Sequence, residues 1–290
     1  MGKFNKYIDA EKGSAVAFIL FALATVAIPG HGSSHDVELI LTVSSFLFAI
    51  LAGFYISRQS KRFDSLRQFV ALQDANWVSV FKTAEIIGKD FANRIADRID
   101  AYYIVWFDFN IGAEAYKHTS KLLDDVYSEL RTHTGIADDN TDSVYDEMAM
   151  FLAEIEKNRN QESVLSREKM TAGQWTVLLI LTGIIVFSLY YLMVPALYSK
   201  VITVLHSTVL VLVILMLRDL QNLMHGGEMQ LDESGQEVFE VIGKPRYYNK
   251  KYLDSGVSVV PEHVKEYRLG LHVPGEKVDI KLCRRREEEV

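Results

Sequence analysis

The chain has 290 residues, a formal net charge of −7 at pH 7 and an apolar content of 49%. The negative charge gives no basis for a nucleic-acid partner, and the single cysteine, Cys283, excludes an intramolecular disulfide. The apolar residues are unevenly distributed, because they gather in runs that alternate with polar and charged segments.

Four apolar runs contain no Lys, Arg, Asp or Glu, and they cover residues 14–29, 39–56, 175–198 and 201–217. Their lengths match the roughly 20 residues of a helix that crosses a bilayer. A buried core helix of a soluble protein could explain one such run, but not four, since core helices keep a polar face. The sequence therefore predicts an all-α integral membrane protein with four transmembrane helices.

The first run also resembles a signal peptide, with a basic start and a small-residue cleavage site at 22–24. Asp9 and Glu11 are unusual in such a leader. We therefore favour a transmembrane helix for this run.

The placement of Lys and Arg predicts the orientation of the runs. The loop 30–38 has neither residue, and the loop between the third and fourth runs has only Lys200. The opposite ends are flanked by Lys3, Lys6, Lys12, Arg58, Lys61, Arg62, Arg67, Arg167, Lys169 and Arg218. By the positive-inside rule, both termini and both long polar segments are expected in the cytoplasm.

Long helices are predicted for the polar segment between the two pairs of runs, because residues 57–174 contain no proline. A helical period continues the second run without a break and predicts one helix over 37–88. A second helix is predicted over 90–131, kinked or divided at Gly112, and a loop over 132–143. A third helix, 144–169, is expected to run straight into the third apolar run.

The C-terminal segment has a different character, with several prolines and glycines. Gly226-Gly227 is expected to end the fourth membrane helix, and 236–244 to form a short helix. Two alternating stretches in 267–283, around Pro-Gly-Glu, predict a small β-hairpin. The charge run 284–289 is expected to be disordered.

We therefore expect four parts in chain order. The first is an N-terminal pair of transmembrane helices. A cytoplasmic helical domain, a second transmembrane pair and a cytoplasmic tail with the hairpin follow. Their predicted ranges are 1–57, 58–173, 174–220 and 221–290.

No motif for catalysis or for a cofactor is present: there is no phosphate-binding glycine loop, CxxC, HExxH or GxSxG. We therefore predict neither an enzyme nor a cofactor. A loop cluster was considered as metal ligands and not favoured, since such clusters are common by chance: His31, His35, Asp36 and Glu38.

His206 lies inside the fourth run and is a possible intramembrane polar site. An ionisable group at this depth suggests a functional role. The favoured alternative is a neutral histidine that is hydrogen-bonded to a neighbouring helix.

Three large apolar residues of the second run, Phe46, Ile50 and Phe54, follow i, i+4, i+8 spacing and share one helix face. This stripe could pack against another helix. If several copies of the helix surround an axis, the same stripe becomes a narrow apolar ring, which can gate ions by dewetting.

At the end of the second run, residues 53–57 read Gly-Phe-Tyr-Ile-Ser, and Arg62-Phe63 follows. The first segment resembles the G-F-Y-V-T segment of the bestrophins, a family of pentameric ion channels, and Arg62-Phe63 stands at the spacing of that family's R-W pair. Asp74-Ala75-Asn76 resembles the E-A-N segment of the bestrophin-like four-helix proteins of bacteria and plants. The residue-level match covers about 20 positions, or about 40 with the last segment.

The resemblance implies a pore neck formed by Phe46, Ile50 and Phe54, with pore-adjacent Gly53, Tyr55 and Ser57. Asp64 stands where the family has a second tryptophan, and the acidic calcium-binding string is missing. Calcium gating and anion selectivity are therefore not carried over.

We accordingly expect a homo-oligomer, a pentamer by resemblance, that conducts inorganic ions passively across the lipid bilayer. We place it in a bacterial cytoplasmic membrane as a multi-pass protein. The alternative is a membrane-anchored sensor or scaffold whose cytoplasmic helices and tail bind a partner. A third possibility is a transporter that uses His206 as a proton relay.

Overall fold

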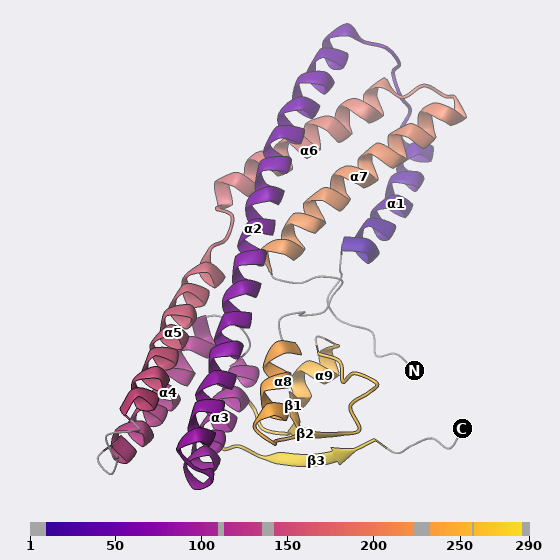
Figure 1. The fold of residues 1–290 in the computed structure, drawn as a ribbon. Coiled ribbons are helices and arrows are strands. Elements are labelled where there is room, and N and C mark those ends of the chain that lie inside the picture. The colour runs from indigo at the N-terminus through magenta and orange to yellow at the C-terminus, as the bar shows by residue number, and fades with distance from the viewer. Residues whose placement is uncertain (1–9, 110–112, 135–141, 223–232, 257, 286–290) are drawn as a thin grey trace. The chain divides into compact units, whose positions relative to one another are not determined.

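The computed structural model describes residues 10–109, 113–134, 142–222, 233–256 and 258–285. Within these ranges the chain is mostly helical, and three short strands form one sheet near the C-terminus (Figure 1). The predicted fold class, a helical membrane protein with a small β element, is confirmed. Internal contacts divide the chain into two units, each described by itself below.

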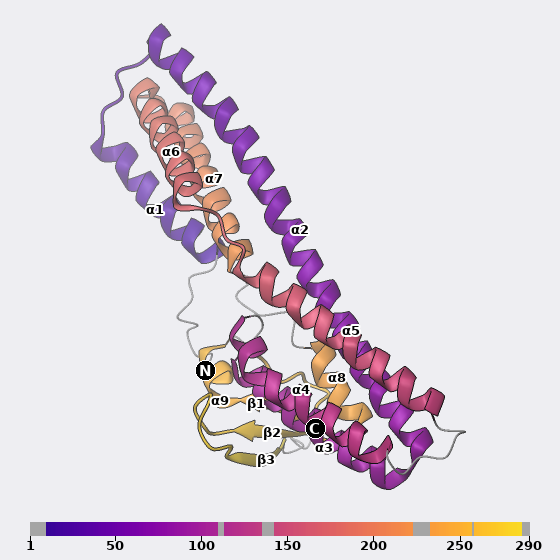
Figure 2. The same ribbon diagram turned by 90° about the vertical axis from the view of Figure 1, so that its left-hand side faces the viewer.

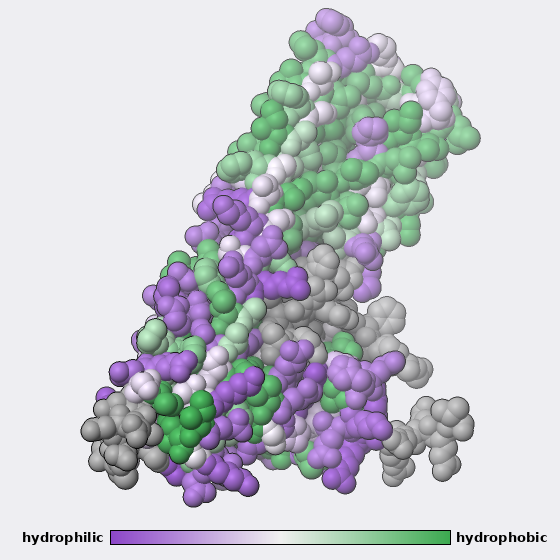
Figure 3. Space-filling model, in the orientation of Figure 1, coloured by the Kyte–Doolittle hydropathy of each residue, from purple (hydrophilic) through white to green (hydrophobic). Residues whose placement is uncertain are grey.

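The first unit, which we call the membrane unit, lies within residues 5–63 and 169–228. Its helices are α1 (Ala10–Ala27), the first part of α2 (His35–Ile87), α6 (Ala172–Leu192) and α7 (Leu197–Gln221). All four are long and apolar enough to cross a membrane. Hydrophobic residues cover most of the visible surface of these helices (Figure 3), and α1, α6 and α7 lie side by side in both ribbon views (Figures 1 and 2).

The core of the membrane unit joins α2 to α6 and α7. Phe48, Ala52 and Tyr55 project from one face of α2, and they pack with residues of the other two helices: Leu178, Leu181, Ile185 and Leu217. Burial of this face determines which side of α2 points into the membrane unit.

The helices α1, α6 and α7 are also tied by polar contacts. The backbone N–H of Ala10 donates to Asp219 Oδ2 at 2.8 Å, and the Tyr190 hydroxyl donates to the carbonyl of Phe21 at 2.8 Å. In the loop after α1, a Cβ added to Gly30 would lie 1.7 Å from the carbonyl oxygen of Met193, so only glycine fits there.

The predicted helix 37–88 is confirmed as α2, which runs unbroken from His35 to Ile87. Gly88 follows with a φ of 156°, a conformation that favours glycine, and α3 begins at the next residue.

The predicted continuity from 144–169 into the third membrane run is wrong. Helix α5 (Asp142–Arg167) ends before α6 begins at Ala172. Thr171 is in an extended conformation and forms a capping box with Gln174, which starts a new helix. The third apolar run, 175–198, also extends beyond the helix that it predicted. Helix α6 ends at Leu192, and Pro195, which has no N–H, lies in the turn before α7.

The second unit, which we call the helix–sheet unit, contains residues 64–168 and the described residues from 233 onwards. Its longer helices are the second part of α2, α3 (Lys89–Phe109), α4 (Ala113–Thr134) and α5. Within the described residues, α3 and α4 cover the predicted helix 90–131, and the predicted kink or division at Gly112 lies outside them. Its core is built from apolar faces of these helices, including Trp77, Ile99, Trp106, Val126 and Leu152.

The sheet is larger than the predicted hairpin. Strands β2 (Glu266–Gly270) and β3 (Ile280–Arg284) pair antiparallel around Pro274-Gly275, as expected. A third strand, β1 (Arg246–Asn249), pairs parallel with β2, so the order is β1-β2-β3. Two short helices flank β1, namely α8 (Glu233–Val241) and α9 (Lys250–Ser255).

The sheet is fastened to α3 by ion pairs. Arg268 makes two hydrogen bonds to the Asp100 carboxylate, at 2.6 and 2.9 Å, and Lys244 contacts Asp97 at 2.8 Å. The predicted helix stop at Gly226-Gly227, most of the loop 132–143 and residues 286–289 of the predicted disordered run lie outside the described residues.

Candidate functional site

The predicted stripe occupies the outward face of α2 in the membrane unit. The exposed fractions are 66% for Phe46, 52% for Ile50 and 61% for Phe54. The opposite face carries the buried residues of the membrane core. The greater part of each of these three side chains is therefore not covered by another helix of the membrane unit. In a bilayer the face is left to lipid, to another copy of the chain, or to a pore.

The predicted pore-adjacent residues fall on both faces. Gly53 and Ser57 are exposed, and a Cβ added to Gly53 would meet nothing within 4 Å. Tyr55 is buried in the membrane core, and its ring meets the Phe54 ring edge-on at 5.7 Å. Tyr55 can therefore fix the orientation of Phe54, but it does not share the outward face.

A buried arginine follows the stripe by two turns. Arg62 is only 4% exposed, and its Nη1 donates to Gln59 Oε1 at 3.2 Å and to the backbone carbonyl of Gln221 at 3.1 Å. The side-chain oxygen of Gln221 accepts from the Met170 N–H and from Trp175 Nε1. This cluster holds together α2, the start of α6 and the end of α7, and it satisfies a carbonyl at the C-terminus of α7.

His206 does not make the expected bond to a neighbouring helix. Its Nδ1 lies 3.2 Å from the backbone carbonyl of Ile202, one turn earlier on α7, and its side chain is exposed. The imidazole therefore faces away from the membrane core.

Two residues of the loop cluster are engaged in other contacts. The His31 ring stacks on Tyr191 at 4.7 Å, and Glu38 accepts a hydrogen bond from Ser33 at 2.6 Å. Among the described residues, no three His, Cys, Asp or Glu side chains lie together as metal ligands.

Asp74, in the segment Asp-Ala-Asn, is buried in the helix–sheet unit. The Tyr103 hydroxyl donates to its Oδ1 at 2.5 Å. Burial, reinforced by the Asp74 charge and hydrogen bond, raises the pKa of Tyr103 well above its ordinary value. Tyr103 therefore remains a hydrogen-bond donor at physiological pH, which makes this contact a fixed link between α2 and α3.

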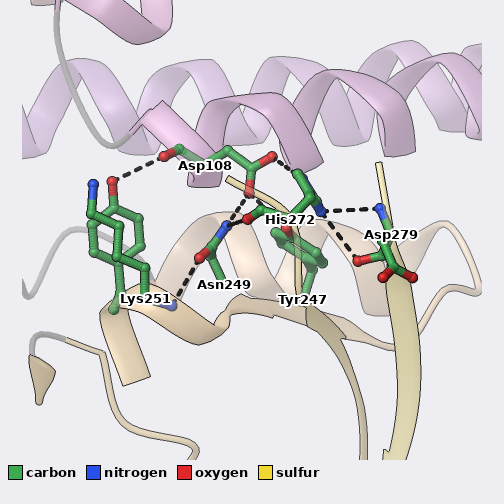
Figure 4. Close-up of polar contacts among 7 residues, drawn as sticks. Asp108, Tyr247, Asn249, Lys251, His272 and Asp279 are labelled. Atoms are coloured by element: carbon green, nitrogen blue, oxygen red, sulfur yellow. Dashed lines mark hydrogen bonds and ion pairs between the residues drawn. The ribbon is translucent and has the colours of Figure 1, made fainter. Parts of the chain in front are cut away.

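A second buried carboxylate, Asp108 at the end of α3, was missed by the sequence analysis (Figure 4). Its Oδ1 accepts from Tyr247 Oη at 2.6 Å and from Asn249 Nδ2 at 2.8 Å. Its Oδ2 lies 2.6 Å from His272 Nε2, and its backbone carbonyl accepts from the Tyr252 hydroxyl. One residue therefore binds side chains from β1, α9 and the loop between β2 and β3.

The electrostatics of this cluster are set by burial and by Asp108. Burial and the bond to Asp108 raise the pKa of Tyr247. Burial by itself lowers the pKa of His272, but the hydrogen bonds to Asp108 and to the Asp279 backbone outweigh it, so that the net shift is upward. Both carboxylate oxygens and both imidazole nitrogens have partners, which suits an anchor better than a catalytic group.

Gly270 is needed for this anchor. A Cβ at this position would lie 2.1 Å from the Tyr247 hydroxyl oxygen, where it would displace the tyrosine from Asp108.

The sequence held one signal for Asp108, namely a lone aspartate on the apolar face Ile-Val-Trp-Phe-Asp-Phe, because a carboxylate at a buried position requires partners.

A family model described as a bestrophin-like domain matches residues 14–233 of the chain. The match spans the helices from α1 to α7 and ends before the sheet begins. No curated protein and no solved structure matches the chain.

Proposed function

The chain belongs to the bestrophin-like family, and on this premise we propose that it is the subunit of a homo-oligomeric ion channel. In this proposal several copies, five by analogy with the bestrophins, surround an axis with the outward face of α2 turned towards it. Inorganic ions pass through passively, and no bond is made or broken.

One observation carries the proposal: Phe46, Ile50 and Phe54 are exposed on a membrane helix whose other face packs in the membrane core. Four residues of helix rise about 6 Å, so the three side chains would make three stacked apolar layers about 12 Å long. A constriction without polar atoms offers a passing ion no substitute for its hydration shell, which allows it to close by dewetting.

The neighbours of the stripe fit the same arrangement. The open space at Gly53 lets another copy of α2 approach closely, as small residues do at helix contacts in membranes. Ser57, one turn beyond Phe54, places a hydroxyl at the end of the neck, where an ion regains water. Tyr55, packed in the membrane core, holds the Phe54 ring in place.

The proposal is tested by ion flux from liposomes that contain the purified protein. Replacing Ile50 and Phe54 together by alanine removes two of the three layers, and we expect a several-fold higher flux. Leu205→Ala is the matched control, because Leu205 is an exposed apolar residue, at 50%, on a different membrane helix. Its flux should equal that of the unchanged protein.

The outcomes separate the channel from the other candidate functions. Absence of flux in both the unchanged protein and the double variant would favour the sensor or scaffold. Uptake that depends on pH and is lost in His206→Ala would favour a transporter.

A further inference from the structure

Two apolar grooves flank α6 in the membrane unit. The first, of about 520 Å³, lies between α6 and α1 and is lined by residues that include Phe21, Ala24 and Ile28. The second, of about 550 Å³, lies between α6 and α2 and is lined by residues that include Val37 and Ile40. Figure 2 shows α6 between these two helices.

The grooves meet on α6. Gly183 and Phe187 line both of them. A Cβ added to Gly183 would meet nothing within 4 Å, so the absent side chain leaves an open notch. The Phe187 ring, 65% exposed, stands one turn further along, between the two grooves. We call the two grooves, together with Gly183 and Phe187 between them on α6, the saddle.

The saddle lies near one end of the membrane unit. Its lining residues belong to the last turns of α6, the end of α1 and the start of α2, next to the loop 28–34. His31 lines the first groove with its ring stacked on Tyr191. Ser188 lines the second groove, and its buried hydroxyl has no hydrogen-bond partner. Each apolar groove thus has a polar group near the end of the membrane unit, which is where a lipid carries its ester and phosphate groups.

We propose that this saddle binds one two-chain membrane lipid astride α6, with an acyl chain in each groove and the glycerol ester region beside Ser188 and His31. Grooves on membrane-spanning helices open into hydrocarbon, and no water is available there to fill them. A helix of another copy is about 10 Å across and cannot enter both grooves with Phe187 between them. A forked molecule with two narrow chains can.

The forces that would hold the lipid predict which substitution displaces it. Lipid tails and groove walls are equally apolar, so there is no hydrophobic gain when a chain enters. Retention depends on van der Waals contact in a matching shape and on a hydrogen bond that the Ser188 hydroxyl donates to an ester carbonyl. A bulky residue at Gly183 should therefore displace the lipid.

The experiment uses the full chain in phosphatidylcholine vesicles that contain a two-chain phosphatidylcholine with a photoreactive diazirine in one acyl chain. After illumination, labelled peptides are mapped by mass spectrometry. We expect label on both flanks of α6, in peptides that contain residues 21–28 and 37–40. Gly183→Trp should lower this labelling several-fold. Gly173→Trp, at an exposed glycine of the same helix outside both grooves, should leave it unchanged.

Three results would overturn the proposal. These are equal labelling in the Gly183 and Gly173 variants, label spread evenly over outward positions such as Val209 of α7, and cross-links that place another copy in the grooves. Equal labelling by a single-chain analogue would overturn the two-chain assignment. Gly183→Leu is measured alongside, so that a failure of the tryptophan variant to assemble still leaves a test. The proposal requires only a membrane-embedded chain, and loss of ion flux has no bearing on it.

Discussion

Asp108 is a buried carboxylate that organises parts of the chain lying far apart in the sequence. Its partners Tyr247, Asn249 and His272 follow it by 139 to 164 residues. All four side chains lie in the helix–sheet unit, where they lock the sheet onto α3. A charge buried at this depth is stable only because every oxygen is engaged.

Replacing Asp108 by alanine should destabilise the helix–sheet unit strongly. Three buried donors lose their acceptor, and each unsatisfied group costs about 1–3 kcal/mol. We expect a loss of at least about 3 kcal/mol in chemical unfolding of the purified protein. Asp97→Ala is the control, since this exposed aspartate on the same helix makes one surface ion pair worth under about 1 kcal/mol. Equal losses in both variants would show that Asp108 is not the anchor.

The pKa of His272 predicts how the stability of the anchor depends on pH. The groups facing the imidazole are the Asp108 carboxylate from α3, the Tyr247 hydroxyl beside it and Asp279 before β3. The pKa is raised in the folded chain, so its stabilisation is fully present below the unfolded value of about 6.5. The stabilisation is lost as the pH rises through the folded value.

The melting temperature of the purified protein should therefore fall more between mildly acidic and mildly alkaline pH than that of His272→Gln. Glutamine retains a hydrogen-bond donor for Asp108 but does not titrate. A parallel pH dependence in the two proteins, or a rise for the unchanged protein, would contradict the role given to His272.

At the scale of elements, the sequence analysis succeeded where one local pattern dominates. The helix predicted over 37–88 was found within two residues, because no proline interrupts it and its helical period continues beyond the apolar run. It failed at α6, although the capping box Thr171-Ala-Gly-Gln174 was present in the sequence. The hydrophobic periods on both sides obscured this polar signal of four residues.

Strand β1 and the Asp108 anchor could not be found in the same way. The partner of β1 is parallel and begins at Glu266, so no turn between the two strands reveals the pairing. For the anchor, only the aspartate on an apolar helix face was visible, and its partners are selected by tertiary packing. The spacing of Phe46, Ile50 and Phe54 predicted that they share one helix face, but not that this face is exposed, and the pore itself stays a prediction.

The start of α6 gives a prediction at this scale. Thr171→Ala removes the N-cap side chain and should cost about 1 kcal/mol of unfolding free energy. Thr176→Ala should cost less than half of this, because that hydroxyl bonds only to a carbonyl of its own helix. Equal melting temperatures for the two variants would show that the capping box does not define the start of the helix.

At the scale of the whole molecule, the chain belongs to the bestrophin-like family and has four helices that are long and apolar enough to cross a membrane, as fits a membrane protein. The predicted ranges of its four parts, the cytoplasmic side of both termini and the pentamer stay predictions. The central claim is that α2, with one face packed and one face apolar and free, turns its free face towards a common axis.

Cross-linking between copies tests that claim most directly. Cys283, the single native cysteine, is replaced by serine, and Phe54→Cys is introduced. A short bifunctional thiol reagent is then applied to the protein in membranes. We predict that Phe54→Cys yields covalent oligomers and that Leu205→Cys, on the outward face of α7, yields none. Cross-linking of Leu205→Cys alone, or of neither variant, would contradict the account.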